Sequence, residues 1–268
     1  MIIKKSPAEI ETMARAGRVV ARANEAVMEA VAPGVSTADL DAIAERVIRS
    51  AGAVPSFKGY RGFPATVCAS VGREIVHGIP SRDVVLRAGD VLSIDCGAIV
   101  DEFHGDSAFT IIVGGEREAA PEVAELVDAT HEAMWRGLAS VLDGNRLGDI
   151  GSSIEAVATA NGHGVVREYV GHGIGRSLHE DPSVPNYGRA GKGLRLSPGW
   201  VIAIEPMFTL GSPQTRLLDD GWTVVTADGS LSAHWEHTVA LTEDGPRVLT
   251  AREGEPVDPT QREARPAA

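Results

Sequence analysis

The chain has 268 residues and a formal net charge of −12, which allow a full buried core and argue against a general nucleic-acid or anionic-membrane surface. Its only cysteines, Cys68 and Cys96, are too few for a disulfide framework. No apolar run reaches the roughly 18 residues of a transmembrane helix, and the start lacks the apolar core of a signal peptide, so we expect a cytoplasmic enzyme without nucleic-acid or membrane partners.

Two helices are predicted at the start of the chain. Ser6-Pro7-Ala8-Glu9 combines a capping serine, a proline suited to the first helical turn and a glutamate that completes a capping box. This helix is expected to run to about Ala30. A second helix is expected over Thr37–Ser50, with Gly52 just past its end.

Residues 53–113 are predicted to be rich in β-structure. Val91–Val100 alternates between small or polar residues and apolar residues, as expected of a strand with two different faces. The chain then turns near Val100-Asp101 and returns through Phe103–Val113. In a simple hairpin Asp95 and Asp106 would lie opposite each other on one face, about 5 Å apart at Cβ.

The second half of the chain repeats this order of elements. Helices are expected at about Pro121–Leu142 and Gly148–Ala160, and strands near Val165–Val170, Trp200–Phe208 and Ala233–Leu241. We expect one catalytic domain over residues 1–252, with halves at about 6–113 and 120–249. The Pro- and charge-rich segment 253–268 is predicted to be disordered.

A shift of 110 residues aligns the two halves. Ala88–Asp95 then falls on Pro198–Glu205, and Gly34, Asp39, Glu45, Val47 and Gly52 fall on Gly144, Asp149, Glu155, Val157 and Gly162. Each half therefore consists of two helices followed by strands, with an acidic residue at the same strand position. A duplicated fold of this kind can bring two carboxylates together across a cleft, where they need a cation or a shared proton.

Four carboxylates lie inside otherwise apolar or small-residue strands: Asp95, Asp106, Glu205 and Glu236. One such group alone would be explained by a salt bridge or hydrogen bonds. All four together need a counterion, because few lysines or arginines lie in these strands. His172, within Gly171-His172-Gly173-Ile174-Gly175, is a natural fifth ligand, and this set is suited to two divalent metal ions that polarise a carbonyl and activate water.

Two further histidines flank glycine or proline loops, where functional side chains often protrude. They are His77, within Val76-His77-Gly78-Ile79-Pro80, and His179, within Leu178-His179-Glu180-Asp181-Pro182. A surface or supporting role is the alternative for either of them. His131-Glu132 lacks the second histidine of a zinc-protease helix, and no phosphate-binding glycine loop with lysine is present.

The sequence resembles type I methionine aminopeptidases over roughly Ile3–Leu249. The matching segments are Gly59-Tyr60-Arg61-Gly62-Phe63-Pro64, Val76-His77-Gly78-Ile79-Pro80, Phe103-His104-Gly105-Asp106, Gly171-His172-Gly173-Ile174-Gly175-Arg176, Ile204-Glu205-Pro206-Met207, Asp220-Gly221-Trp222-Thr223-Val224 and Glu236-His237-Thr238. The resemblance implies the α+β pita-bread fold, with duplicated helix–helix–strand halves around a central antiparallel sheet. It also implies removal of the initiator methionine from nascent chains when the second residue is small.

The resemblance also assigns roles to individual residues. Two divalent ions (Co, Mn, Fe, Zn or Ni) would be held by Asp95, Asp106, His172, Glu205 and Glu236. Glu205 would be the general base, and His77 and His179 would contact the substrate. The methionine side chain would lie in a slot formed by Phe57, Tyr60, Phe63, Cys68, Leu178 and Trp222. A monomer is expected.

Some positions depart from the family pattern. Leu178 stands where bacterial members often have Phe, and Phe57 where many have Cys. Loop 211–220 is Lys-rich and linked to ribosome docking in well-known members, but here Arg216 is its only cation beside Asp219 and Asp220, which disfavours transient ribosome contact. The alternatives are an Xaa-Pro aminopeptidase or prolidase, which usually has a sizeable domain before the catalytic one, and a non-enzymatic binding protein that has lost ligands.

Overall fold

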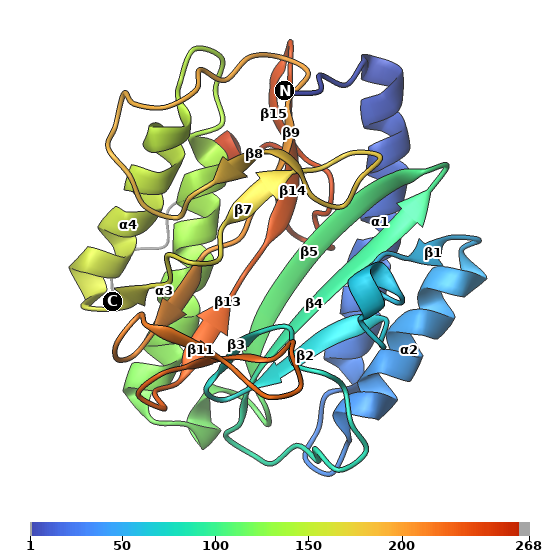
Figure 1. The fold of residues 1–268 in the computed structure, drawn as a ribbon, viewed down its shortest axis with the longest axis vertical. Coiled ribbons are helices and arrows are strands. Elements are labelled where there is room, and N and C mark those ends of the chain that lie inside the picture. Colours follow the sequence, from blue (N-terminus) through green and yellow to red (C-terminus); the bar gives the residue numbers. More distant parts are fainter. Residues whose placement is uncertain (1, 263–268) are drawn as a thin grey trace.

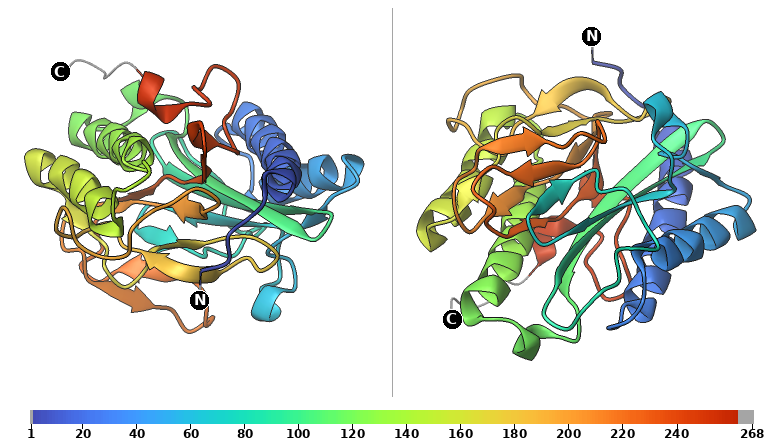
Figure 2. Two further views of the ribbon diagram at one scale, coloured as in Figure 1. Left: turned by 90° about the horizontal axis from the view of Figure 1, so that it is seen from above. Right: turned by 60° about the horizontal axis from the view of Figure 1, so that its bottom comes forward.

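Four long helices flank a set of antiparallel strands in a computed structural model that describes residues 2–262 (Figure 1). The helices are α1 (Pro7–Ala30), α2 (Thr37–Ser50), α3 (Pro121–Ala139) and α4 (Leu147–Asn161). The pair α1–α2 lies on one side of the strands and α3–α4 on the other, in Figure 1 and from above in Figure 2. No helix in this described range is long and apolar enough to cross a membrane.

The predicted start of α1 is confirmed in detail. The Ser6 N–H donates to a Glu9 carboxylate oxygen at 2.9 Å, and the Glu9 N–H donates to Ser6 Oγ at 3.4 Å. Ser36 and Asp39 form the same reciprocal contact at the start of α2. These contacts satisfy backbone donors that the helix itself leaves unpaired, so the sequence sets both starting points.

The strands form four small sheets. The first half provides β1 (Val54–Pro55), β2 (Val67–Val71), β4 (Val91–Val100) and β5 (Phe103–Ile112), in which β4 pairs with the other three. The second half provides a five-stranded sheet, in which the strands lie in the order β15 (Gly245–Val248), β14 (His237–Thr242), β9 (Val201–Ile204), β7 (Gly171–Gly173) and β8 (Glu180–Val184). A three-stranded sheet has the order β13 (Ser232–His234), β10 (Met207–Thr209) and β6 (Gly164–Val165). A second three-stranded sheet has the order β11 (Thr215–Leu217), β12 (Val224–Thr226) and β3 (Glu74–Val76).

Strands of the second half are shorter than expected. The predicted strand Trp200–Phe208 is interrupted at Glu205-Pro206, between β9 and β10, because proline has no N–H to continue a ladder. The predicted strand Ala233–Leu241 is likewise interrupted at Trp235-Glu236. Most of the expected strand Val165–Val170 is not a strand, since β6 ends at Val165. Both glutamates of the predicted metal site therefore stand at strand interruptions.

The register of the β4–β5 hairpin also differs from the expectation. Asp95 pairs with Ala108, and Asp106 with Gly97, so the two aspartates are diagonal neighbours rather than direct partners. The turn is Asp101-Glu102, with φ values of 46° and 70°. Two consecutive positive φ angles are those of a tight two-residue hairpin turn, which moves the pairing by one residue on each strand and keeps both aspartates on the same face.

The two halves of the fold meet along β5. The backbones of Ala108 and Glu236 exchange hydrogen bonds at 3.1 and 3.3 Å. Two residues further, Thr238 Oγ1 accepts from the Asp106 N–H at 3.1 Å and donates to the Asp106 carbonyl at 2.8 Å. This seam joins two predicted metal ligands, Asp106 and Glu236, through main-chain contacts.

The C-terminal segment differs from its predicted disorder over residues 253–262. The Val248 N–H donates to the Val257 carbonyl at 2.8 Å, and Arg262 pairs with Glu132 of α3 at 2.7 Å. The short 3₁₀ helix η3 (Pro259–Gln261) lies in this segment. Its charged composition suggested a solvated tail, but Glu255 pairs with His237 and Arg252, as Arg262 does with Glu132. Residues 263–268 lie outside the described residues.

Candidate metal centre

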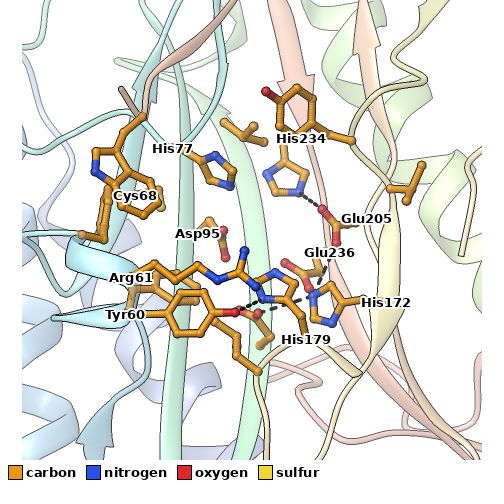
Figure 3. Close-up of a pocket in the computed structure, with 18 of the residues that line it drawn as sticks. Tyr60, Arg61, Cys68, His77, Asp95, His172, His179, Glu205, His234 and Glu236 are labelled. Atoms are coloured by element: carbon orange, nitrogen blue, oxygen red, sulfur yellow. Dashed lines mark hydrogen bonds and ion pairs between the residues drawn. The ribbon is translucent and has the colours of Figure 1, made fainter. Parts of the chain in front are cut away.

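The five predicted metal ligands line one pocket of about 390 Å³. Figure 3 shows Asp95, His172, Glu205 and Glu236 directed into the same space. Asp95 comes from β4 and Asp106 from β5, His172 lies on β7, and the two glutamates lie at the strand interruptions beside β9 and β14. Residues that lie up to 141 positions apart in the sequence thus converge at the seam between the halves.

His172 presents one ring nitrogen to the carboxylates. Its Nδ1 lies 2.9 Å from the Gly173 carbonyl oxygen, which can only accept a hydrogen bond, so Nδ1 carries the proton. Nε2 is then the free lone pair, at 3.6 Å from Glu205 Oε1 and 4.0 Å from Asp106 Oδ2. A histidine fixed by a backbone carbonyl in this way is prepared to bind a metal through its other nitrogen.

Three of the pocket carboxylates each have one buried oxygen without a protein partner in the described chain. Asp95 Oδ1, Asp106 Oδ1 and Glu236 Oε1 are buried and have no hydrogen-bond partner within residues 2–262. Burial raises the pKa of Asp95 to about 7. Burial, followed by repulsion from the other acids, raises the pKa values of Asp106, Glu205 and Glu236 well above their ordinary range.

These observations fit a divalent cation. The closest subset is Asp106, His172 and Glu236, whose ligand atoms lie within 4.8 Å of one another. Carboxylate oxygens with one neutral imidazole are a donor set for divalent transition metals. Burial lowers the pKa of His172 to about 3, so its ring is neutral and available as a ligand at ordinary pH. A cation would satisfy the buried oxygens and remove the cost of their repulsion.

His77 and His179 border the metal centre, as Figure 3 shows. His179 Nδ1 lies 2.8 Å from the Tyr60 hydroxyl, and its ring centroid lies 4.3 Å from that of His172. His77 has a positive φ of 62° and packs edge-on against Tyr169 and Trp222. Burial lowers the pKa of His77 to about 4, and partial desolvation lowers the pKa of His179. Both rings are therefore neutral hydrogen-bonding groups at pH 7.

An apolar slot opens beside the metal centre. All six residues predicted for it line the pocket, and they belong to or pack against one apolar cluster: Phe57, Tyr60, Phe63, Cys68, Leu178 and Trp222. The Phe63 and Trp222 rings meet edge to face at 5.1 Å. Cys68 on β2 stands opposite Asp95 on β4, so the slot adjoins the ligands. Its walls suit an unbranched apolar side chain.

Several pocket residues were not assigned a direct role by the sequence. His234 Nε2 is buried without a hydrogen-bond partner in the described chain and lies 3.9 Å from Glu205 Oε2. Asn186 holds the Glu205 backbone through its side-chain amide at 2.9 Å. Tyr169, Glu168 and Arg61 complete the wall. Only the spacing of His234 two residues before Glu236 could have indicated its position, because alternate residues of a strand share a face.

Known proteins share this sequence and fold. The model of metallopeptidase family M24 matches residues 11–243. A methionine aminopeptidase of Clostridium acetobutylicum is 50% identical, with 93% of this chain and 99% of that protein covered. Methionine aminopeptidase 1 of Mycobacterium tuberculosis is 51% identical, with 93% and 95% covered.

Solved structures agree with these relatives. The crystal structure of a methionine aminopeptidase from Thermotoga maritima has a TM-score of 0.91 at 41% identity and covers 94% of this chain and 100% of that chain. A prolidase from Pyrococcus furiosus has a TM-score of 0.74 at 25% identity, and only 66% of its chain is covered. The expected α+β pita-bread fold is thereby confirmed.

Proposed function

The chain belongs to metallopeptidase family M24, and from this premise we propose that it is a methionine aminopeptidase. It would remove the N-terminal methionine of proteins and peptides whose second residue is small. The observation that carries this proposal is the joint placement, in one pocket, of an apolar slot and of carboxylates with buried oxygens that have no hydrogen-bond partner in the described chain. The relatives of about 50% identity bear the same activity in their names.

Two divalent ions would be held by Asp95, Asp106, His172, Glu205 and Glu236. When bound, such ions polarise a carbonyl and activate water. Asp106 and Glu236, whose backbones lie at the seam, would hold the ions together with Asp95 and with the neighbouring pair His172–Glu205. Four carboxylates balance the charge of two divalent cations. Co, Mn, Fe, Zn and Ni all suit these ligands.

The protein's own side chains supply proton transfer and orientation. A Glu205 carboxylate oxygen, largely buried beside His172, would accept the proton of the attacking water. The neutral ring of His179 would donate a hydrogen bond to the substrate carbonyl as negative charge develops there. His77 would contact the substrate from the opposite wall, and its packing against Trp222 fixes the ring.

The slot would select methionine at the first position. A flexible thioether fills an irregular apolar slot well, whereas β-branched and charged side chains do not. Leu178 replaces an aromatic wall, so we expect somewhat looser discrimination, with norleucine accepted because small misfits cost only about 1–3 kcal/mol. The second residue must fit beside the metal centre, which favours Gly, Ala and Ser over Leu and Lys.

The alternatives have less support. Prolidases share the fold, but the P. furiosus prolidase is only 25% identical with a TM-score of 0.74, whereas the methionine aminopeptidase of C. acetobutylicum is 50% identical. A binding protein without activity would not need five converging ligands. A cytoplasmic location, a monomeric state and nascent chains as substrates complete the proposal. Ribosome contact through loop 211–220 is not part of it, because Arg216 is the only cation there.

A peptide panel tests the proposal. Metal-free protein should not cleave Met-Ala-Ser, and added Co or Mn should restore cleavage. Mass spectrometry should then show release of Met before Gly, Ala or Ser and not before Leu or Lys. Calorimetric titration of the metal-free protein with Mn should give two ions per chain, with weaker binding in His172→Ala because one ligand is lost. Preferential cleavage of Xaa-Pro peptides would support the prolidase alternative, and activity without metal would contradict the proposal.

A further inference from the structure

Arg61 stands at the mouth of the pocket in an unusual backbone conformation. It lies in η1 (Tyr60–Gly62) with φ 48° and ψ 23°, in the left-handed region that non-glycine residues rarely adopt. Backbone hydrogen bonds close this turn, from Gly59 to the Phe63 carbonyl at 2.8 Å and from Phe63 to the Tyr60 carbonyl at 2.9 Å. Such conformations persist where the surrounding structure holds them, often beside functional sites.

The guanidinium of Arg61 is a free positive charge. Arg61 is the only lysine or arginine among the described residues that line the pocket. Its side chain is solvent-exposed, lies over the Tyr60 ring at 5.3 Å and has no carboxylate partner in the described chain. Figure 3 shows it extending from the Tyr60 side toward the centre of the pocket. The molecule as a whole is acidic, with a net charge of −12. The positive charge of Arg61 therefore differs in sign from the net charge of the protein around it.

The path of a bound peptide leads past this charge. In the proposed function the slot would take the first side chain, and the scissile carbonyl would lie beside His179 and the metal ligands. An extended chain advances about 3.3 Å per residue, so the third residue reaches the pocket mouth. Arg61 and His179 both flank the Tyr60 ring at this rim, because the guanidinium lies over that ring at 5.3 Å and His179 Nδ1 lies 2.8 Å from its hydroxyl. Glu168 is also exposed at the pocket mouth. Its carboxylate would repel an acidic substrate side chain that lay beside Glu168 rather than beside Arg61.

We propose that Arg61 is a specificity-determining residue that favours substrates with an acidic third residue. This inference rests on the proposed aminopeptidase function. An exposed guanidinium and a substrate carboxylate attract each other weakly in water. We therefore expect a preference of about two- to fivefold in kcat/KM, which decreases as salt screens the charges.

The experiment compares the isosteric peptides Met-Ala-Asp-Ala-Ser and Met-Ala-Asn-Ala-Ser with the metal-loaded enzyme. The ratio of their kcat/KM values should exceed one and fall toward one in Arg61→Gln. Arg61→Lys should keep most of the preference because it keeps the charge. Arg49→Gln, an exposed arginine of α2 paired with Glu45, is the matched control and should not change the ratio. Raising NaCl from 20 to about 500 mM should reduce the wild-type ratio.

An Asp/Asn ratio that is the same in wild type and Arg61→Gln would overturn the inference. A preference that appears only when Asp is moved to the fourth position would also overturn the assignment to the third residue. The asparagine peptide separates this failure from failure of the proposed function. If wild-type enzyme with metal does not cleave it, the aminopeptidase assignment itself is wrong.

Discussion

Lys5 and Glu180 form an ion pair that is almost completely buried, with side-chain exposures of 4% and 7%. The Lys5 ammonium lies 2.5 Å from the Glu180 carboxylate and also donates to the Ile3 carbonyl at 2.9 Å. Glu180 directly follows His179 and accepts a hydrogen bond from the Ser177 backbone at 3.3 Å. A residue that precedes α1 therefore anchors the loop that carries one of the proposed substrate contacts.

Removing the lysine should leave a buried carboxylate without a partner. We expect Lys5→Met to lower the free energy of unfolding by roughly 3–5 kcal/mol, the usual cost of breaking a buried pair on one side. Lys5→Met with Glu180→Gln should recover part of this loss, because no buried charge then remains. Urea unfolding of the single and double variants measures both effects. A double variant whose loss equals the sum of the two single losses would contradict the pairing.

At the scale of elements, helix α1 approaches β5 and the chain after β15 without space for a side chain. A Cβ atom added at Gly17 would lie 2.1 Å from the Leu249 carbonyl oxygen, and one added at Gly105 would lie 2.8 Å from the Gly17 nitrogen. Gly105 immediately precedes the ligand Asp106. The close contact between helix and strand therefore supports the backbone that presents this carboxylate.

Gly17→Ala tests this contact. Alanine favours a helix by up to about 1 kcal/mol over glycine, so intrinsic propensity predicts stabilisation. The clash is with backbone atoms, which cannot rotate away, and overpacking of this kind costs about 1–3 kcal/mol or more. We therefore expect a lower Tm in thermal unfolding followed by circular dichroism. Arg18→Ala, on the exposed face of the same helix, should change stability by less than about 0.5 kcal/mol, and equal Tm values for the two variants would refute the steric explanation.

The elements differ in how well the sequence predicted them. Local signals were sufficient for α1 and α2, because each start is set by a capping box within four residues. The hairpin register depended on the Asp101-Glu102 turn, whose positive φ angles have no asparagine–glycine signature. The interruption at Glu205-Pro206 follows from the proline, whereas the one at Glu236 depends on tertiary contacts, such as the exchange of hydrogen bonds between Ala108 and Glu236, that no local pattern encodes.

The convergence of the candidate-site residues on one pocket was easier to predict than the strands that carry them. Carboxylates in apolar strands are chemically unusual wherever the strand ends, so Asp95, Asp106, Glu205 and Glu236 were identifiable without correct registers. The slot residues came from the resemblance to a family, and all six line the pocket. His234, Asn186 and Lys5 were not predicted, because their contacts join residues that are far apart in the sequence.

At the scale of the whole molecule, two duplicated halves bring their acids together at one seam, and this has a consequence for stability. In metal-free protein burial raises the pKa of Asp95 to about 7, and the pKa values of Asp106, Glu205 and Glu236 are raised well above their ordinary range. The unfolded chain releases these protons near pH 4. Above that pH the folded state holds more protons, so these groups destabilise the folded state as pH rises.

Buried histidines act in the opposite direction over a different range. Burial lowers the pKa values of His172 and His234 to about 3 and of His77 to about 4, whereas an unfolded histidine titrates near pH 6.5. These rings stabilise the folded state above pH 6.5, and that contribution is lost as pH falls through the range from 6.5 to about 3. Below pH 6.5 the histidines make stability rise with pH while the carboxylates make it fall. Above pH 6.5 only the loss of stability caused by the carboxylates continues.

We therefore predict that chelated protein loses stability between pH 6.5 and 8.5, by about 1.4 kcal/mol per pH unit for each proton retained only by the folded state. Adding Mn should reverse the trend, because the cation binds the ionised carboxylates and competes with protons for them. Differential scanning calorimetry of chelated and Mn-loaded protein across this range measures both slopes. A Tm of chelated protein that stays constant or rises from pH 6.5 to 8.5 would show that the four acids are already ionised without metal, and that the folded protein pays no electrostatic penalty for bringing its two halves together.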